Sequence, residues 1–177
     1  KSERIRFGAA VARTPAKIAG FATEHGLTVH NDYRRALEDP TLDAVVLATP
    51  HSQHAEQVIA AAKAGKPVFV EKPFTLTKES ADAAVAACRG HGVVLAFGHN
   101  RRFLPALQAL KQLVEDGRIG KPLQVEGNFS SGSGYRHGRD SWRADRAEAP
   151  AGGMTALGIH VVDAMVHLCG RIDEVQS

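Results

Sequence analysis

The residues best suited to chemistry lie at the end of one short apolar strand. In GKPVFVEKPF (residues 65–74), the apolar residues 68–70 are followed at once by Glu71, Lys72 and Pro73. In a doubly wound α/β sheet the carboxyl ends of the strands face the ligand crevice, so an acid and an amine there point at a bound molecule. The sequence therefore predicts a catalytic or binding role for Glu71 and Lys72. The alternative is a surface ion pair at a strand end.

Three histidines are further candidates. His51 and His54 begin a predicted helix and lie one turn apart, directly after Thr49 and Pro50. Two histidines at that spacing can bind a metal, but no third ligand is apparent, so no metal site is predicted. For His54, a structural role in hydrogen bonding is as consistent with the sequence as a role in a binding site. His160 lies in an apolar helix, where a histidine is either a hydrogen-bonded core residue or an acid/base group.

The elements that must position these residues alternate regularly along the first hundred positions. Strands are predicted at residues 5–12, 28–30, 43–49, 67–71 and 93–97, and the first and third read as buried on both faces. Helices are predicted from Thr14-Pro15 to Gly26, with Thr14 as N-cap, and at 32–39, 51–64 and 78–89. This alternation predicts βαβ units and a doubly wound parallel sheet, an α/β fold.

After Gly98 the pattern changes. An amphipathic helix is predicted at 104–115, an alternating half-exposed strand at 123–129, a long polar loop at 130–150 and a buried helix, apolar all round, at 153–168. The domain boundary is expected between residues 100 and 120. We therefore predict one domain over 1–118 and the start of an α+β domain over 119–177.

Composition excludes several classes of function. The 177 residues are 44% hydrophobic with a net charge of +3, and the basic residues are scattered rather than clustered. This argues against a nucleic-acid surface, and no apolar run reaches the length of a membrane span. We expect a cytoplasmic protein without a membrane or nucleic-acid partner. Cys88 and Cys169 show no metal or disulfide pattern and are expected to be reduced packing thiols.

Three blocks of sequence together resemble the Gfo/Idh/MocA oxidoreductase family. They are LATPHSQHAEQVIAAAKAGKPVFVEKPF, FGHNRRF and GGMTALGIHVVDAMVHLCG, in the family's order and spacing. The resemblance implies an N-terminal Rossmann domain that binds NAD or NADP. It also implies a C-terminal domain whose sheet carries the sugar or polyol substrate and often the homo-oligomer interface.

The same resemblance implies that part of the family pattern lies outside this sequence. Family members begin with a strand and a glycine-rich turn that binds pyrophosphate, and neither is found here. In the strand order 3-2-1-4-5-6 that first strand lies in the middle of the sheet. We therefore expect a fragment of a protein about twice as long, which alone binds dinucleotide poorly or not at all and is inactive.

Cofactor contacts are implied for several strand ends. Arg13 and Thr14 follow the first predicted strand, where NAD enzymes place an acid. An arginine there favours the 2′-phosphate of NADP, although it is also consistent with a solvated arginine and an NAD site. The other cofactor contacts implied by the resemblance are Thr49, Pro50, His51, Glu71, Lys72 and Asn100.

The resemblance makes Lys72 and His160 the catalytic pair. Lys72 would polarise the reacting hydroxyl or carbonyl, with a cis peptide before Pro73 fixing its direction. His160 would remove the hydroxyl proton. Many members carry an aspartate one turn before this histidine. This chain has Ala156 there, and Asp163, one turn after His160, is a candidate substitute.

Further residues are assigned more loosely. Arg101 and Arg102 either meet an anionic substrate group or cap the domain junction. Candidates for sugar stacking or gating in the polar loop are Tyr135, Trp142 and Arg143.

Two functions are consistent with these residues. The first is an NAD(P)-dependent dehydrogenase or reductase acting on a secondary alcohol or ketone of a sugar, cyclitol or related polyol. The second is a family member that does not dehydrogenate. It would be either a dinucleotide-binding regulatory protein or an enzyme that uses bound NAD for a transient oxidation during elimination or glycoside cleavage. Ala156 is the residue that keeps the second function open.

Overall fold

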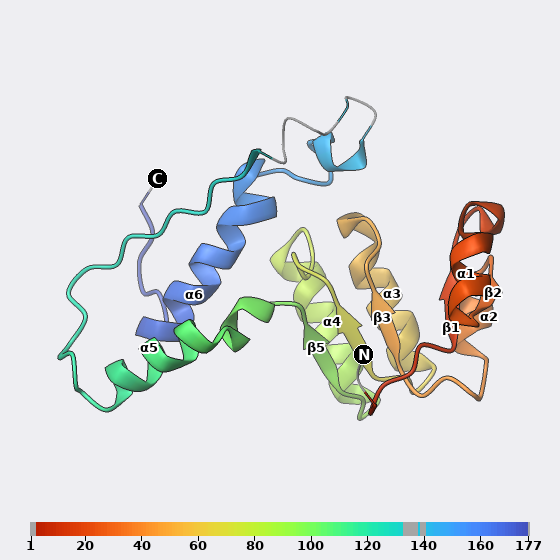
Figure 1. Cartoon of the computed structure of the whole chain (residues 1–177), viewed down its shortest axis with the longest axis horizontal. Coiled ribbons are helices and arrows are strands. Elements are labelled where there is room, and N and C mark those ends of the chain that lie inside the picture. Colours follow the sequence, from red (N-terminus) through yellow and green to blue (C-terminus); the bar gives the residue numbers. More distant parts are fainter. Residues whose placement is uncertain (1–2, 133–137, 139–140, 177) are drawn as a thin grey trace.

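The computed structural model describes residues 3–132, 138 and 141–176. A mainly parallel α/β unit occupies the first hundred residues, and two long helices, α5 and α6, lie beside one end of it (Figure 1). No helix of the described residues is long and apolar enough to cross a membrane.

The first part is a pair of parallel strands with three short helical segments. It comprises β1 (Ala9–Val11), η1 (Pro15–Ile18), α1 (Ala19–His25), β2 (Thr28–His30) and α2 (Tyr33–Leu37), and β1 pairs with β2. The predicted strand over 5–12 is thus three residues long. Thr14 precedes η1, but its side chain makes no capping hydrogen bond. Gly26 ends α1 as predicted, with a φ of 63° that favours glycine.

The second part holds the strand that precedes Glu71 and Lys72. It comprises β3 (Val45–Leu47), η2 (His51–Gln53), α3 (His54–Lys63), β4 (Val68–Val70), α4 (Lys78–Gly90) and β5 (Leu95–Phe97). The three strands are parallel in the order β3-β4-β5, and β1 and β2 form a separate hydrogen-bonded sheet. In the strand order 3-2-1-4-5-6 given above, the first strand of the family lies between the strands that correspond to β1 and β3. The parallel α/β prediction is confirmed.

Only one face of this sheet forms the core. Leu47, Val68 and Val70 pack with buried residues of α3 and α4. Successive side chains of a strand point to opposite faces, so Val46 and Phe69 lie on the other side and are 55% and 38% exposed. Val11 of β1 is also 44% exposed. The expectation that the first and third strands are buried on both faces is therefore wrong.

The third part runs from η3 (Asn100–Phe103) through α5 (Pro105–Glu115) to η5 (Trp142–Ala144), η6 (Met154–Gly158) and α6 (Ile159–Cys169). The predicted strand at 123–129 is wrong, since these residues form no regular element. Alternation alone does not make a strand, because a strand needs a partner to accept its backbone hydrogen bonds.

The last predicted helix also differs from expectation. It begins as a π-helical segment, η6, and continues as α6. Its buried residues are polar, namely Thr155, His160 and Asp163, whereas Val162 and Met154 are exposed. A fully buried apolar helix is therefore the wrong description, because its most buried positions are polar.

The two cysteines behave differently from each other. Both are free, but only Cys88 is buried in the core, where burial raises the pKa of its thiol. Cys169 is exposed. The expected packing role therefore holds for Cys88 alone.

Candidate active site

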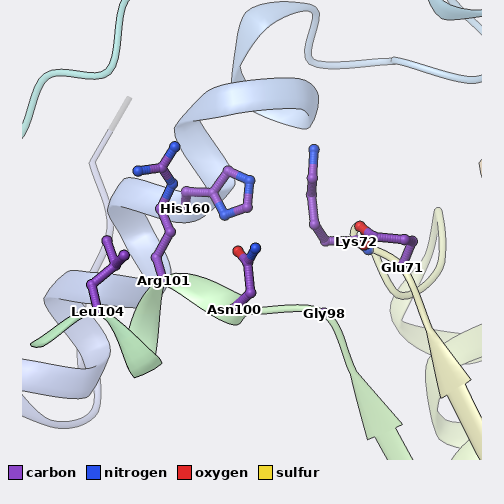
Figure 2. Close-up of a pocket in the computed structure, with 7 residues that line it drawn as sticks. All are labelled: Glu71, Lys72, Gly98, Asn100, Arg101, Leu104 and His160. Carbon is purple, nitrogen blue, oxygen red and sulfur yellow. Dashed lines mark hydrogen bonds between the residues drawn. The ribbon is translucent and has the colours of Figure 1, made fainter. Parts of the chain in front are cut away.

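A pocket of about 280 Å³ lies where the ends of β4 and β5 face α6. It is lined by Glu71, Lys72, Gly98, Asn100, Arg101, Leu104 and His160. Figure 2 shows the polar ends of Lys72, Asn100 and Arg101 directed toward the same region as the His160 ring. Parallel strands place their carboxyl ends at one edge, so residues distant in sequence meet here.

Lys72 enters this pocket from the end of β4. The Glu71 N–H still donates to Leu47 O at 2.8 Å, so the ladder holds the strand up to the residue before the lysine. The expected cis peptide between Lys72 and Pro73 is present. The Lys72 Nζ donates to Ala156 O at 2.9 Å. Partial burial lowers the pKa of Lys72, and Glu71 opposes that shift.

The floor of the pocket beside Lys72 depends on Gly98. A Cβ at this buried position would lie 3.3 Å from the Glu71 carboxylate. Glycine therefore lets the end of β5 approach Glu71 closely, and the carboxylate stays in place, accepting from the Lys72 backbone N–H at 3.2 Å. A backbone-lined floor of this kind leaves room for a flat ligand ring.

His160 faces Lys72 from α6. It is 9% exposed, and its Nδ1 is buried without a hydrogen-bond partner among the described residues. Burial lowers the pKa of His160, and the positive charges of Lys72 and Arg101 lower it further. The ring is therefore neutral near pH 7, with an unpartnered nitrogen beside the pocket. A neutral imidazole in this state can accept a proton.

Asp163 does not take the place of the missing aspartate. Its carboxylate accepts from Arg102 Nε at 3.0 and 2.9 Å and from Arg102 Nη2 at 2.6 Å, and His99 Nδ1 lies 3.6 Å away. This pairing raises the pKa of Arg102. The proposed substitution by Asp163 is wrong, because the ion pair holds the carboxylate on the η3 side of α6. What meets Lys72 at the aspartate position is the backbone carbonyl of Ala156.

The histidines after β3 have separate roles. His54 is fully buried between two carbonyl oxygens, with Nδ1 2.9 Å from Pro73 O and Nε2 3.0 Å from Thr49 O. It ties the end of β3 to the turn that carries Lys72, so the structural alternative describes it. His51 Nδ1 lies 2.6 Å from Glu148 O. Since a carbonyl only accepts, this nitrogen carries the proton.

The remaining predicted cofactor residues fall into two groups. Thr49 and Pro50 lie at the end of β3, and the Thr49 hydroxyl donates to Gln57 Oε1 at 2.6 Å. Asn100 lines the pocket. Arg13 and Thr14 are exposed beside β1 and are not among the residues that line it.

The polar loop contributes contacts that sequence reasoning missed. Glu148 accepts hydrogen bonds from the backbone N–H and the hydroxyl of Ser52. Burial raises the pKa of this carboxylate, but the hydrogen bonds outweigh burial, and the pKa is lowered overall. Trp142 packs edge-on to His51, with ring centroids 5.0 Å apart, and Arg143 stacks on Trp142. Tyr135 lies outside the described residues. The sequence around Glu148, a single glutamate in a polar loop, did not predict its hydrogen bonds with Ser52.

Comparison with known proteins decides the family. Residues 1–99 match the family described as "Oxidoreductase family, NAD-binding Rossmann fold", and residues 107–177 match the "GFO/IDH/MocA C-terminal domain". The chain belongs to the Gfo/Idh/MocA oxidoreductase family. The Rossmann-like fold class predicted above is confirmed with it.

Individual Gfo/Idh/MocA proteins are similar over most of the chain. Levoglucosan dehydrogenase of Pseudarthrobacter phenanthrenivorans is 33% identical over 148 residues, 83% of this chain and 38% of the relative. The 2,7-anhydro-N-acetylneuraminate hydratase of Mediterraneibacter gnavus is 34% identical over 155 residues, 86% of this chain and 40% of the relative. The myo-inositol 2-dehydrogenase of Lactobacillus plantarum superposes with a TM-score of 0.83 at 26% identity, over 96% of this chain and 50% of that one. The chain therefore spans half or less of each.

Proposed function

We propose that the protein carrying this chain is an NAD(P)-dependent oxidoreductase acting on a secondary alcohol or ketone of a sugar, cyclitol or related polyol. The observation that carries the proposal is the meeting of the Lys72 amine and the unpartnered His160 imidazole in one pocket at the strand ends. Similarity to levoglucosan and inositol dehydrogenases supports the substrate class. In this proposal residues 1–118 bind the cofactor, and residues 119–177 begin the substrate and homo-oligomer domain.

The residues present fit a nicotinamide cofactor at the strand ends. Thr49 and Pro50 at β3, Glu71 and the glycine floor at β4 and β5, and Asn100 would hold it, with His51 beside them. When bound, the nicotinamide supplies the hydride acceptor or donor.

Two side chains then handle the proton and the developing charge. The Lys72 ammonium has three N–H donors, and Ala156 O uses one of them. The other two can donate to the reacting oxygen and stabilise the charge that forms on it. The His160 imidazole, which lines the pocket, accepts the hydroxyl proton during oxidation and returns it during reduction.

The choice of nucleotide rests on Arg13. This exposed arginine follows β1, where an acid would select NAD, so we propose NADP as the preferred cofactor. Fluorescence titration with NADPH and NADH tests this. Arg13→Asp should reverse an order that favours NADPH, and unchanged affinities in that variant would rule out the assignment.

A second function is favoured by Ala156. Without the aspartate, Lys72 pairs with a backbone carbonyl instead of a charged side chain. Such a site also suits a transient oxidation during elimination, and one similar protein is a 2,7-anhydro-N-acetylneuraminate hydratase. A purely regulatory dinucleotide-binding protein would show affinity for the cofactor and no turnover.

The test uses the longest natural polypeptide that contains this sequence. Turnover of a panel of sugars and cyclitols with NAD⁺ and NADP⁺ is compared for the wild type and Lys72→Met. General acid–base groups contribute about 10²–10⁴-fold, so a loss of that size is expected. Lys78→Met is the matched control, because Lys78 is an exposed lysine at the start of α4 that pairs with Asp82. Equal rates in the two variants would refute the role of Lys72.

A further inference from the structure

The side chains of the two adjacent arginines after β5 make different contacts. The Arg102 guanidinium donates both Nε and Nη2 to Asp163 and so joins η3 to α6. Arg101 instead lines the pocket with Lys72 and His160, and Figure 2 shows its guanidinium beside the His160 ring. Of the two roles that the sequence left open for this pair, capping the junction therefore belongs to Arg102.

The Arg101 guanidinium contacts an aromatic ring but forms no hydrogen bond among the described residues. Its central carbon lies over the Phe129 ring, 4.0 Å from the ring centroid, which is a cation–π contact. Within the described part of the chain, its nitrogens make no hydrogen bond. A half-buried arginine that lies over an aromatic ring and keeps its N–H donors free is suited to a planar, bidentate acceptor.

The charge of the pocket points the same way. Its charged lining residues are Glu71, Lys72 and Arg101, so with His160 neutral the lining carries one net positive charge. Lys72 already donates to Ala156 O, and Glu71 accepts from the Lys72 backbone. The positive charge of Arg101 also contributes to lowering the pKa of both Lys72 and His160. A single negative charge on the ligand would balance the excess.

We propose that Arg101 binds a carboxylate on the substrate, so that the substrate is a sugar acid rather than a neutral polyol. One carboxylate supplies two coplanar acceptors for the fork and the one negative charge that the lining lacks. The acid group would lie at the boundary with a second cavity of about 400 Å³, which Arg101, Leu104 and His160 also line. The turnover of such a substrate rests on the function proposed above, whereas its binding does not.

Calorimetry with matched pairs of ligands tests the proposal in the longest natural polypeptide, with and without NADPH. The pairs are glucuronate and glucose, galacturonate and galactose, and mannuronate and mannose, which differ only in a carboxylate replacing a hydroxymethyl group. At least one acid should bind about tenfold or more tightly than its neutral partner, the range of one charge-assisted bidentate pair. No preference for any acid would overturn the proposal.

Variants separate the effect of the Arg101 guanidinium on ligand preference from the effect of the protein's overall positive charge. Arg101→Gln should abolish the preference for the acid, and Arg101→Lys should keep part of it, because a lysine retains the charge without the planar fork. Arg118→Gln removes an exposed arginine after α5 and should leave the preference within about twofold. Retention of the full preference in Arg101→Gln would overturn the assignment. If that variant does not fold, an undiminished preference in Arg101→Lys would do so.

Two further outcomes are informative. Tighter binding of glucose 6-phosphate than of any uronate, lost in Arg101→Gln, would overturn the carboxylate and assign the site to a phosphate. Arg101-dependent uronate binding without any turnover would uphold this inference and refute the proposed function. Turnover of neutral polyols, with the same ratio of affinities for acid and neutral ligands in the wild type and in Arg101→Gln, would uphold the proposed function and refute this inference.

Discussion

The ion pair between Arg102 and Asp163 is predicted to hold α6, and with it His160, against the strand ends. The pair joins η3 to a position one turn beyond His160 on α6. The Asp163 side chain is 7% exposed, whereas that of Arg102 is 39% exposed. Removing one partner of a fully buried pair costs about 3–5 kcal/mol. Because water screens the arginine side of this pair, we expect Arg102→Met to lower the free energy of unfolding by about 2 kcal/mol.

Asp163→Leu should cost less, about 1 kcal/mol, because the partly exposed Arg102 can turn toward water while the buried Asp163 carboxylate cannot. A double-mutant cycle measured by urea unfolding separates the pair from its surroundings. In the double variant, the loss of stability should fall short of the sum of the two single losses by about 1–2 kcal/mol. Single losses that add to within about 0.5 kcal/mol would show that the pair contributes nothing of its own, and the reasoning would fail.

Two other predictions concern the pocket itself. Gly98→Ala should raise the KM for the nicotinamide cofactor severalfold, because the added Cβ presses on the Glu71 carboxylate. Gly90→Ala, where nothing lies within 4 Å, is the control, and equal KM values in the two variants would contradict the prediction. The pH profile of kcat/KM should be bell-shaped, because catalysis needs neutral His160 and protonated Lys72. Since both pKa values are lowered, the acid limb should lie below the ordinary imidazole value of about 6.5 and the alkaline limb below the ordinary lysine value of about 10.4. An acid limb above pH 6.5 would exclude His160 as the base.

The sequence predicted the parts of the fold that local pattern controls. The alternation of apolar strands and helices led to the parallel sheet, and the abrupt polar end of β4 led to Lys72 in the pocket. His160 was found through its motif, although an apolar helix alone favours a hydrogen-bonded core histidine. These signals are encoded within a few residues of the feature they predict.

Features that depend on distant partners were not predictable in the same way. The alternation in residues 123–129 satisfied the pattern for a strand, but no strand of the described residues pairs with this segment. The assignment of Asp163 failed because helical spacing puts it near His160, whereas its partner, Arg102, lies 61 residues away. The roles of Arg101 and Arg102 were inseparable in sequence and differ only through Phe129 and Asp163.

The most direct test of the oxidoreductase site follows deuterium from the substrate. A polyol or sugar acid that shows turnover is labelled at the carbon that bears the reacting hydroxyl, and the nucleotide is examined by mass spectrometry after reaction. The account predicts one deuterium in the reduced nicotinamide, and loss of that product in Lys72→Met but not in Lys78→Met. Consumption of the substrate with no labelled nucleotide accumulating would contradict net dehydrogenation and support the transient oxidation that Ala156 leaves open.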